Sequence, residues 1–132
     1  MPSVERVAGV TVITPTGDIN HAEMVAVKNA IRDALAEGRR RLVLDLSEVD
    51  HINYMTLGVL VERAGRVERA GGALHIAGLS PYLERILRFS GVDDLFRIFE
   101  SVEAAVAAHH AAVLEGASAF AGASGSWVPR MN

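Results

Sequence analysis

The chain contains no cysteine and no apolar run long enough to cross a bilayer. Without cysteine, disulfides, thiolate zinc sites and cysteine nucleophiles are excluded. A membrane-spanning helix needs roughly 18 consecutive apolar residues. The amino-terminal segment also lacks the apolar region of a signal peptide. We therefore expect a cytoplasmic protein with no direct membrane insertion.

Aromatic residues are few, at 5% of 132 residues, and the net charge is only −3. Half of the residues are nevertheless hydrophobic. This balance is typical of one globular domain with a real core, and it argues against a disordered chain or a nucleic-acid-binding protein. Glycine, alanine and serine dominate the end of the chain. We therefore predict a folded domain over residues 1–115 and a low-complexity flexible tail over residues 116–132, with docking of Trp127 as the alternative.

Short apolar runs bounded by turn residues predict strands over residues 4–7, 10–15, 42–46, 73–77 and 96–99. Residues 17–20 and the stretch between residues 46 and 57 are expected to be loops. Four helices are expected, beginning after Asn20, at Leu57, at Ser80-Pro81 and after Ser101, the last running to about Glu115. The order of elements predicts an α/β fold with a mixed, mainly parallel sheet of about five strands and about four helices.

Apolar residues at helical spacing identify the faces that should pack on this sheet. The first helix is expected to bury Met24, Val27, Ile31 and Leu35 and to stop at Gly38. The second helix is expected to bury Leu57, Leu60, Val61, Ala64 and Val67. The third helix is expected to bury Leu83, Ile86, Leu87 and Phe89.

The most informative stretch runs from Leu42 to Leu60, where a buried strand leads through a loop into a helix. Binding sites of parallel sheets commonly lie in such loops. The three arginines that precede this strand, Arg39, Arg40 and Arg41, form either a solvated strand entrance or an anion site.

Several sequence motifs, in the same order, resemble the STAS domain of bacterial anti-sigma factor antagonists. The resemblance covers roughly residues 3 to 112 and implies that family's fold. The motifs are Gly17-Asp18-Ile19-Asn20, Leu44-Asp45-Leu46-Ser47-Glu48-Val49, Leu57-Gly58-Val59-Leu60, Gly71-Gly72-Ala73-Leu74, Gly78-Leu79-Ser80-Pro81 and Ser90-Gly91-Val92-Asp93-Asp94-Leu95-Phe96.

In the sigma-regulating members of that family, a kinase that is also an anti-sigma factor phosphorylates a hydroxyl in the loop after Leu-Asp-Leu-Ser. The unphosphorylated antagonist binds that kinase and releases sigma. Here Tyr54 and Met55 stand at the hydroxyl pair, Asn53 replaces an acid, and Asn20 replaces another acid before the first helix. Met55, which takes the position of the phosphorylated serine, cannot be phosphorylated. Thr56 is the shifted alternative.

The expected partner-binding surface is the loop and the outer face of the second helix. Tyr54, Met55 and Val59 supply an apolar centre, and Arg63 and Arg66 supply a possible rim. A scattered solvent face is the alternative. The full set of predicted binding residues is Asn20, Asn53, Tyr54, Met55, Thr56, Val59, Arg63 and Arg66.

No motif predicts an enzyme, a metal site or a cofactor. The five histidines have no metal-ligand spacing, although His51 and His75 could lie on neighbouring strand ends. The resemblance implies a regulatory module that binds a kinase-type anti-sigma factor in partner switching, without the usual serine phosphorylation. The alternative is a non-switching adaptor or scaffold subunit of a stress-sensing or lipid-transport ATPase complex.

Overall fold

The computed structural model describes the backbone of residues 2–121 and the side chains of residues 2–114. Seven strands, four α-helices and two short 3₁₀ turns make up the described part of the chain. The strands are β1 (Ser3–Val7), β2 (Val10–Thr14), β3 (Gly17–Ile19), β4 (Arg41–Asp45), β5 (Val49–Ile52), β6 (Ala73–Ala77) and β7 (Arg97–Phe99). The helical elements are α1 (His21–Ala36), η1 (Tyr54–Thr56), α2 (Leu57–Arg69), α3 (Pro81–Phe89), η2 (Asp93–Leu95) and α4 (Val102–Ala121).

The main sheet has five strands in the order β1-β2-β4-β6-β7. Only β1 runs antiparallel to its neighbour, and the other three pairs are parallel. The predicted α/β class, with a mixed and mainly parallel sheet of five strands and four helices, is therefore confirmed. The opening hairpin turns through Ala8 and Gly9, which both have positive φ angles, of 51° and 82°. Two positive φ values are typical of the type I′ turn, whose twist matches that of the flanking strands.

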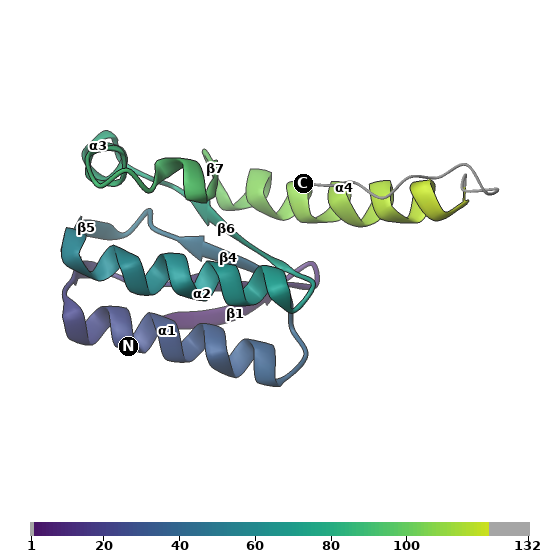
Figure 1. Ribbon diagram of the computed structural model, residues 1–132, viewed down its shortest axis with the longest axis horizontal. Helices are drawn as coiled ribbons and strands as arrows, with labels where there is room; N and C mark the ends of the chain where they lie inside the picture. Colours follow the sequence, from purple (N-terminus) through teal and green to yellow (C-terminus); the bar gives the residue numbers. More distant parts are fainter. Residues whose placement is uncertain (1, 122–132) are drawn as a thin grey trace.

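Helices cover both faces of the sheet. On one face α1 and α2 pack side by side, and α3 lies at the end of the sheet near β5 (Figure 1). Their buried side chains form the main core with the inward residues of β4 and β6, such as Leu44 and Ile76. On the other face α4 buries Ala105 and Val106 against β2 and β4 and extends past the sheet (Figure 1). No helix of the described chain is both long and apolar enough to span a bilayer.

Two segments that were expected to be loops are strands. Gly17–Ile19 forms β3 and Val49–Ile52 forms β5, and these two pair in parallel as a separate two-stranded sheet. Both strands are short, and β5 has the burial pattern buried, exposed, exposed, buried instead of strict alternation. A segment of this kind carries almost no period-two signal, so its pairing depends on tertiary context.

The helix faces were predicted with local errors. Phe89, which was expected in the core, is 95% exposed. It lies about 120° around α3 from Leu83, because each residue turns an α-helix by about 100°. Leu35 and Val61 are half-buried, and Ala34 replaces Leu35 in the buried set of α1. The last helix runs to Ala121, beyond its expected end at Glu115. Residues 122–132, including Trp127, lie outside the described residues.

Candidate protein-binding site

Asn20 and Asn53 are brought to one surface by the small β3–β5 sheet. Ile19 pairs with Ile52, so the residues that follow them are neighbours although they are 33 positions apart in the chain. The Asn53 amide donates to the carbonyl oxygen of Ile19 at 3.0 Å. Both asparagines are helix caps: Asn20 Oδ1 accepts from the Glu23 amide at 2.9 Å, and Asn53 Oδ1 accepts from the Met55 amide at 3.0 Å. Asn20 thus precedes α1, as expected, and Asn53 begins the η1 turn.

The η1 turn presents two large side chains and hides a third. Tyr54 is 67% exposed and Met55 is 77% exposed. Thr56 is 3% exposed, and its Oγ1 donates to the carbonyl oxygen of Asn53 at 2.7 Å. The turn therefore offers an apolar tip, while its only threonine hydroxyl is directed into the molecule.

An apolar hollow of about 590 Å³ lies between the start of α2 and the end of α3. Tyr54, Leu57 and Gly58 line one side, and Ile86 and Phe89 line the other. The sequence analysis did not place Phe89 on this surface. The signal was its position on the flank of the α3 stripe, where a large aromatic can remain outside the core.

The outer face of α2 contributes less than expected. Val59 is half-buried and packs against the core. The Arg63 side chain is only 12% exposed, because its position borders the buried stripe, and its Nε lies 3.3 Å from Glu62 Oε1. Arg66 is 53% exposed and also pairs with Glu62, and this hydrogen bond holds the pKa of the Glu62 carboxyl below its ordinary value. Arg66 is thus the more accessible of the two predicted rim arginines.

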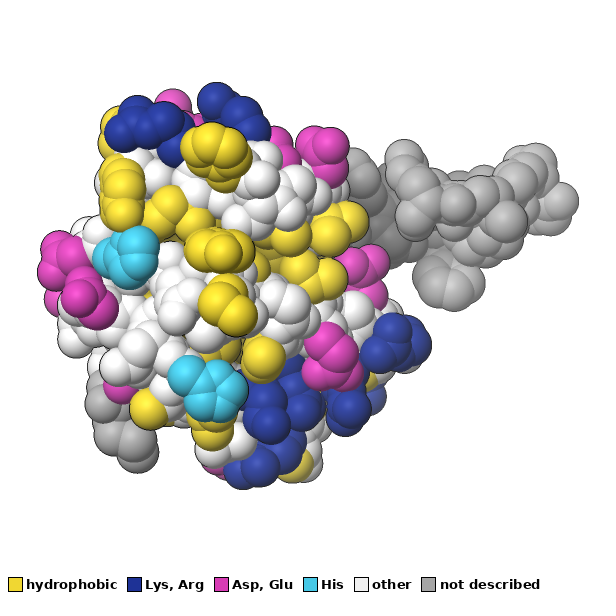
Figure 2. All heavy atoms as spheres, turned by 60° about the vertical axis from the view of Figure 1, so that its left-hand side comes forward, with side chains coloured by type: hydrophobic (Ala, Val, Ile, Leu, Met, Phe, Trp, Pro, Cys, Tyr) yellow, Lys and Arg dark blue, Asp and Glu magenta, His cyan; other side chains and the backbone are white. Residues whose placement is uncertain are grey.

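Figure 2 shows the side of the molecule on which β5, α3 and the start of α2 come forward, with hydrophobic side chains gathered near its centre. Basic side chains lie at the upper and lower margins of the same view. Exposed apolar residues surrounded by polar ones are characteristic of a protein-binding surface. We call Tyr54, Met55 and Phe89 the apolar tip of this surface.

The histidines do not form a metal centre. His51 Nδ1 lies 2.7 Å from the Tyr82 hydroxyl and links β5 to α3. His75 instead stacks on His109 beneath α4, with ring centroids 3.8 Å apart. His51 and His75 thus have separate partners. Among the described residues there is no group of three or more metal-ligating side chains.

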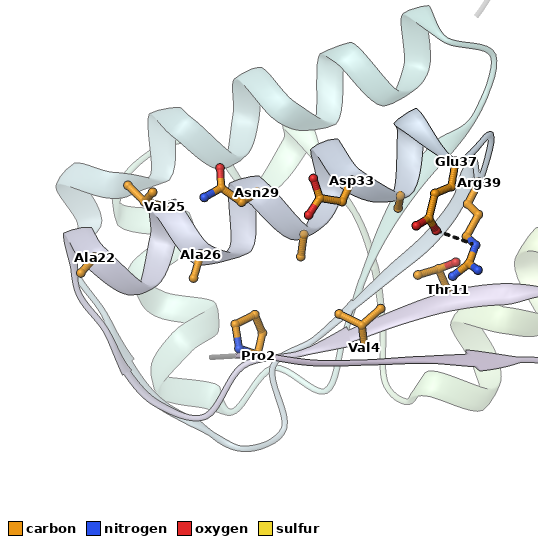
Figure 3. Close-up of a pocket in the computed structure, with 12 residues that line it drawn as sticks. Pro2, Val4, Thr11, Ala22, Val25, Ala26, Asn29, Asp33, Glu37 and Arg39 are labelled. Atoms are coloured by element: carbon orange, nitrogen blue, oxygen red, sulfur yellow. Dashed lines mark ion pairs between the residues drawn. The ribbon is translucent and has the colours of Figure 1, made fainter.

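A second hollow, of about 530 Å³, lies between α1 and the β1–β2 hairpin (Figure 3). Small side chains of α1, including Ala26 and Asn29, form one wall, and the Glu37–Arg39 ion pair lies at one end. Thr11 on β2 is 1% exposed, and its Oγ1 has no hydrogen-bond partner among the described residues. This hollow lies apart from the apolar tip.

Comparisons with known proteins agree with this architecture. The family model described as the STAS domain matches residues 1–105. BtrV of Bordetella bronchiseptica, described as a candidate anti-sigma factor antagonist, is 27% identical over 111 residues, which cover 84% of this chain and 96% of that protein. The anti-sigma F factor antagonist of Paenibacillus polymyxa is 22% identical over 99 residues, which cover 74% and 85% of the two chains.

Solved structures show the same fold at low identity. An anti-sigma factor antagonist from Mycobacterium paratuberculosis superposes with a TM-score of 0.73 at 24% identity, over 83% of this chain and 93% of that one. The antagonist SpoIIAA in its unphosphorylated form superposes with a TM-score of 0.61 at 15% identity, over 89% and 98% of the chains. With the family model matching most of its length, the chain belongs to the STAS domain family.

Proposed function

We propose that this protein is a regulatory binding module of the anti-sigma factor antagonist type, whose partner is a kinase-type anti-sigma factor. The single observation that carries the proposal is the apolar tip, because Tyr54, Met55 and Phe89 are 67%, 77% and 95% exposed. Large apolar side chains left in water at one surface gain free energy when a partner covers them. Several relatives named above are anti-sigma factor antagonists, which fits a partner of this class.

The loop chemistry supports binding without a phosphorylation switch. Met55 occupies the place of the phosphorylated serine and has no hydroxyl, so it presents a permanent apolar contact. The shifted alternative, Thr56, is buried and donates its hydroxyl hydrogen to Asn53. A kinase would have to open η1 and break this hydrogen bond to reach it. We therefore propose that docking proceeds without a phosphorylation switch at residue 55 or 56.

In this proposal the predicted binding residues have unequal roles. Tyr54, Met55 and Arg66 are accessible enough to contact a partner directly. Asn20, Asn53 and Thr56 hold the local backbone through hydrogen bonds. Val59 and Arg63 act mainly by packing beneath this surface.

Affinity capture from the native lysate, with and without ATP and Mg²⁺, tests this proposal. The wild-type protein is compared with Met55→Glu, which puts a charge at the apolar tip, and bound proteins are identified by mass spectrometry. Leu114→Glu is the matched control, since Leu114 is 69% exposed on α4, across the sheet from the tip. We expect recovery of a kinase-like anti-sigma factor with the wild type and the control, and its loss with Met55→Glu.

Other outcomes contradict the proposal in different ways. Stable recovery of a transporter ATPase or of scaffold subunits would favour the adaptor alternative. Recovery of the kinase with Met55→Glu as efficiently as with the wild type would show that the partner binds elsewhere. A phosphate on Thr56 that depends on the recovered kinase would contradict docking without a switch.

A further inference from the structure

Arginine side chains gather at the amino-terminal end of the parallel strands, away from the apolar tip. Arg39 and Arg40 precede β4, and Arg41 begins it. Arg6 joins them from β1, because it pairs with Thr11 and Thr11 pairs with Leu42. All four arginines line one hollow of about 680 Å³. This volume is within the range of small-ligand sites.

The charge in this hollow is unbalanced. Among the described residues, the only acidic one that lines it is Glu37, whose Oε1 lies 3.3 Å from Arg39 Nε. No carboxylate of the described residues is within ion-pair distance of Arg6, Arg40 or Arg41. Four guanidinium groups against one carboxylate leave three positive charges in excess.

The carboxyl ends of α1 and α2 lie at the same hollow and offset part of that charge. Each helix end carries roughly half a negative charge, so the two together remove about one unit. An excess of about two positive charges remains by this reckoning. Like charges at close range repel one another, so gathering four arginines here costs free energy. A strand entrance that is merely solvated does not require such a cluster.

Two glycines keep the rim of the hollow open. A Cβ atom on Gly71 would lie 3.9 Å from Arg40 Nη1, and one on Gly9 would lie 3.9 Å from Arg41 Nη2. Both glycines have φ angles near +85°, at +89° and +82°, where side chains are strained. The guanidinium groups of Arg40 and Arg41 therefore lie beside bare backbone that a ligand can approach closely.

The hollow also borders the attachment of α4. Val113 of α4 lines it, and His110 Nε2 lies 2.8 Å from the carbonyl oxygen of Ala8 in the hairpin turn. The neighbouring His109 Nε2 lies 2.8 Å from the Leu42 carbonyl oxygen. Burial of its ring lowers the pKa of His109, and the charge of Arg41 lowers it further. An anion over Arg41 would raise that pKa.

We propose that this hollow binds a phosphate-bearing anion with at least two negative charges. Guanidinium groups present paired N–H donors that match phosphate oxygens, and several of them neutralise a multiply charged phosphate. The phosphate group can come from a small phosphorylated molecule in solution or from the headgroup of an anionic lipid. This site is separate from the apolar tip, so its failure would leave the proposed function untouched.

Titration of pyrophosphate into the isotope-labelled full chain, followed by NMR at about 0.15 M salt, tests the soluble source. Co-sedimentation with vesicles that contain cardiolipin, whose headgroup carries two phosphates, against vesicles of phosphatidylcholine alone, tests the lipid source. The variants are Arg40→Gln and the double variant Arg40→Gln/Arg41→Gln. Arg85→Gln is the matched control, because Arg85 is an exposed arginine on α3 that does not line the hollow.

We expect pyrophosphate to shift the amide signals of Gly9, Gly38 and Gly71 and to raise the pKa of His109. Each arginine removed should weaken binding by about fivefold, the factor for two unit charges about 4 Å apart in water. Cardiolipin binding by the wild type that is lost in the double variant, without any pyrophosphate binding, would assign the lipid source. The proposal is overturned when neither probe binds, or when Arg40→Gln and the double variant bind as well as Arg85→Gln.

Discussion

Thr11 and Thr56 are buried to almost the same extent, but their hydroxyl groups are in opposite situations. Thr56 Oγ1 has a carbonyl partner at 2.7 Å, whereas Thr11 Oγ1 has no partner among the described residues. A buried hydroxyl without a partner loses its hydrogen bonds to water and forms none within the protein, which destabilises the folded state. The same substitution at these two positions should therefore change stability in opposite directions.

Thr11→Val should raise the free energy of unfolding by about 1 kcal/mol. Valine keeps the shape and the β-branched side chain that suits strand β2, and it removes the unpartnered hydroxyl. Chemical denaturation at neutral pH measures the change. A loss of stability of similar size would show that this hydroxyl is hydrogen bonded in solution.

Thr56→Val should lower the free energy of unfolding by about 1 kcal/mol, because the Asn53 carbonyl oxygen loses the Thr56 hydroxyl and keeps only the Thr56 amide as a donor. The same denaturation experiment measures this change, with Thr11→Val as its counterpart. Amide exchange at residues 54–56 should also become faster, since the hydrogen bond closes η1. Unchanged exchange and stability would mean that the hydroxyl contributes nothing to the turn.

Met55→Ser should convert the protein into a kinase substrate. The side chain at this position is 77% exposed, and its amide is already fixed by Asn53. A serine there would present an accessible hydroxyl, and a phosphate on it would bring almost two negative charges to the apolar tip. Incubation with the captured kinase and ATP, followed by mass spectrometry, measures the modification. We expect phosphorylation of Met55→Ser and none of the wild type.

Once phosphorylated, the Met55→Ser variant should also release the kinase, whereas the same variant without phosphate should still bind it. A Met55→Ala variant serves as the control, because it removes the methionine without adding a hydroxyl. Failure of the kinase to modify Met55→Ser would place the determinants of phosphorylation in other residues that differ here, such as Asn20 and Asn53.

At the scale of elements, local chemistry predicted some features well and others poorly. Ser80 and Pro81 begin α3 as expected, because the Ser80 hydroxyl accepts from the Leu83 amide at 3.1 Å and proline fits the first helical turn. The β3–β5 pair was missed because its stability comes from pairing between segments about 30 residues apart, which no local pattern encodes. The residues of the candidate site could be proposed from the sequence, but the role of these strands in joining Asn20 to Asn53 was not visible.

On the helices, too, features set by a local pattern were predicted and features set by tertiary contacts were not. Of the five residues predicted for the buried stripe of α2, four are buried, Leu57, Leu60, Ala64 and Val67, because repeated spacing fixes the centre of a stripe. The flanks were not fixed, so the exposure of Phe89 and the covering of Arg63 came only from the structure. Residues at the flanks of a stripe follow no distinct sequence pattern, so the sequence does not predict which of them a neighbouring element will cover.

For the whole molecule, the sheet separates three environments. The apolar tip lies beyond the carboxyl ends of β3 and β5, and the arginine-lined hollow lies at the amino-terminal end of β4. Beneath α4, on the face opposite α1 and α2, His75 and His109 form a buried stacked pair. The His75 ring also packs against Phe99, with ring centroids 4.8 Å apart. The attachment of α4 therefore depends on two histidines whose pKa values are lowered by burial.

Acidification should weaken the fold through this pair. Burial lowers the pKa of His75 from 6.5 to about 4, and the charges of His109 and Arg97 add to the effect. Burial also lowers the pKa of His109, where Arg41, Arg97 and His110 disfavour a further positive charge. Between pH 6.5 and about 4, His75 is protonated in the unfolded chain but not in the folded chain. The free energy of unfolding therefore falls as the pH falls.

The decrease in the free energy of unfolding that is due to His75 should reach about 3 kcal/mol and then level off below the pKa of His75 in the folded protein. Urea denaturation of the wild type and of His75→Phe over this pH range separates the effect of His75 protonation from that of the carboxylates, which titrate in both proteins. Phenylalanine keeps a ring against Phe99 and His109 without a titrating group, so the wild type should lose about 3 kcal/mol more stability than His75→Phe as the pH falls from 6.5 to about 4. Exposed His21→Phe is the control and should run parallel to the wild type. A His75→Phe curve parallel to the wild type would mean that protonation of His75 is not what destabilises the attachment of α4.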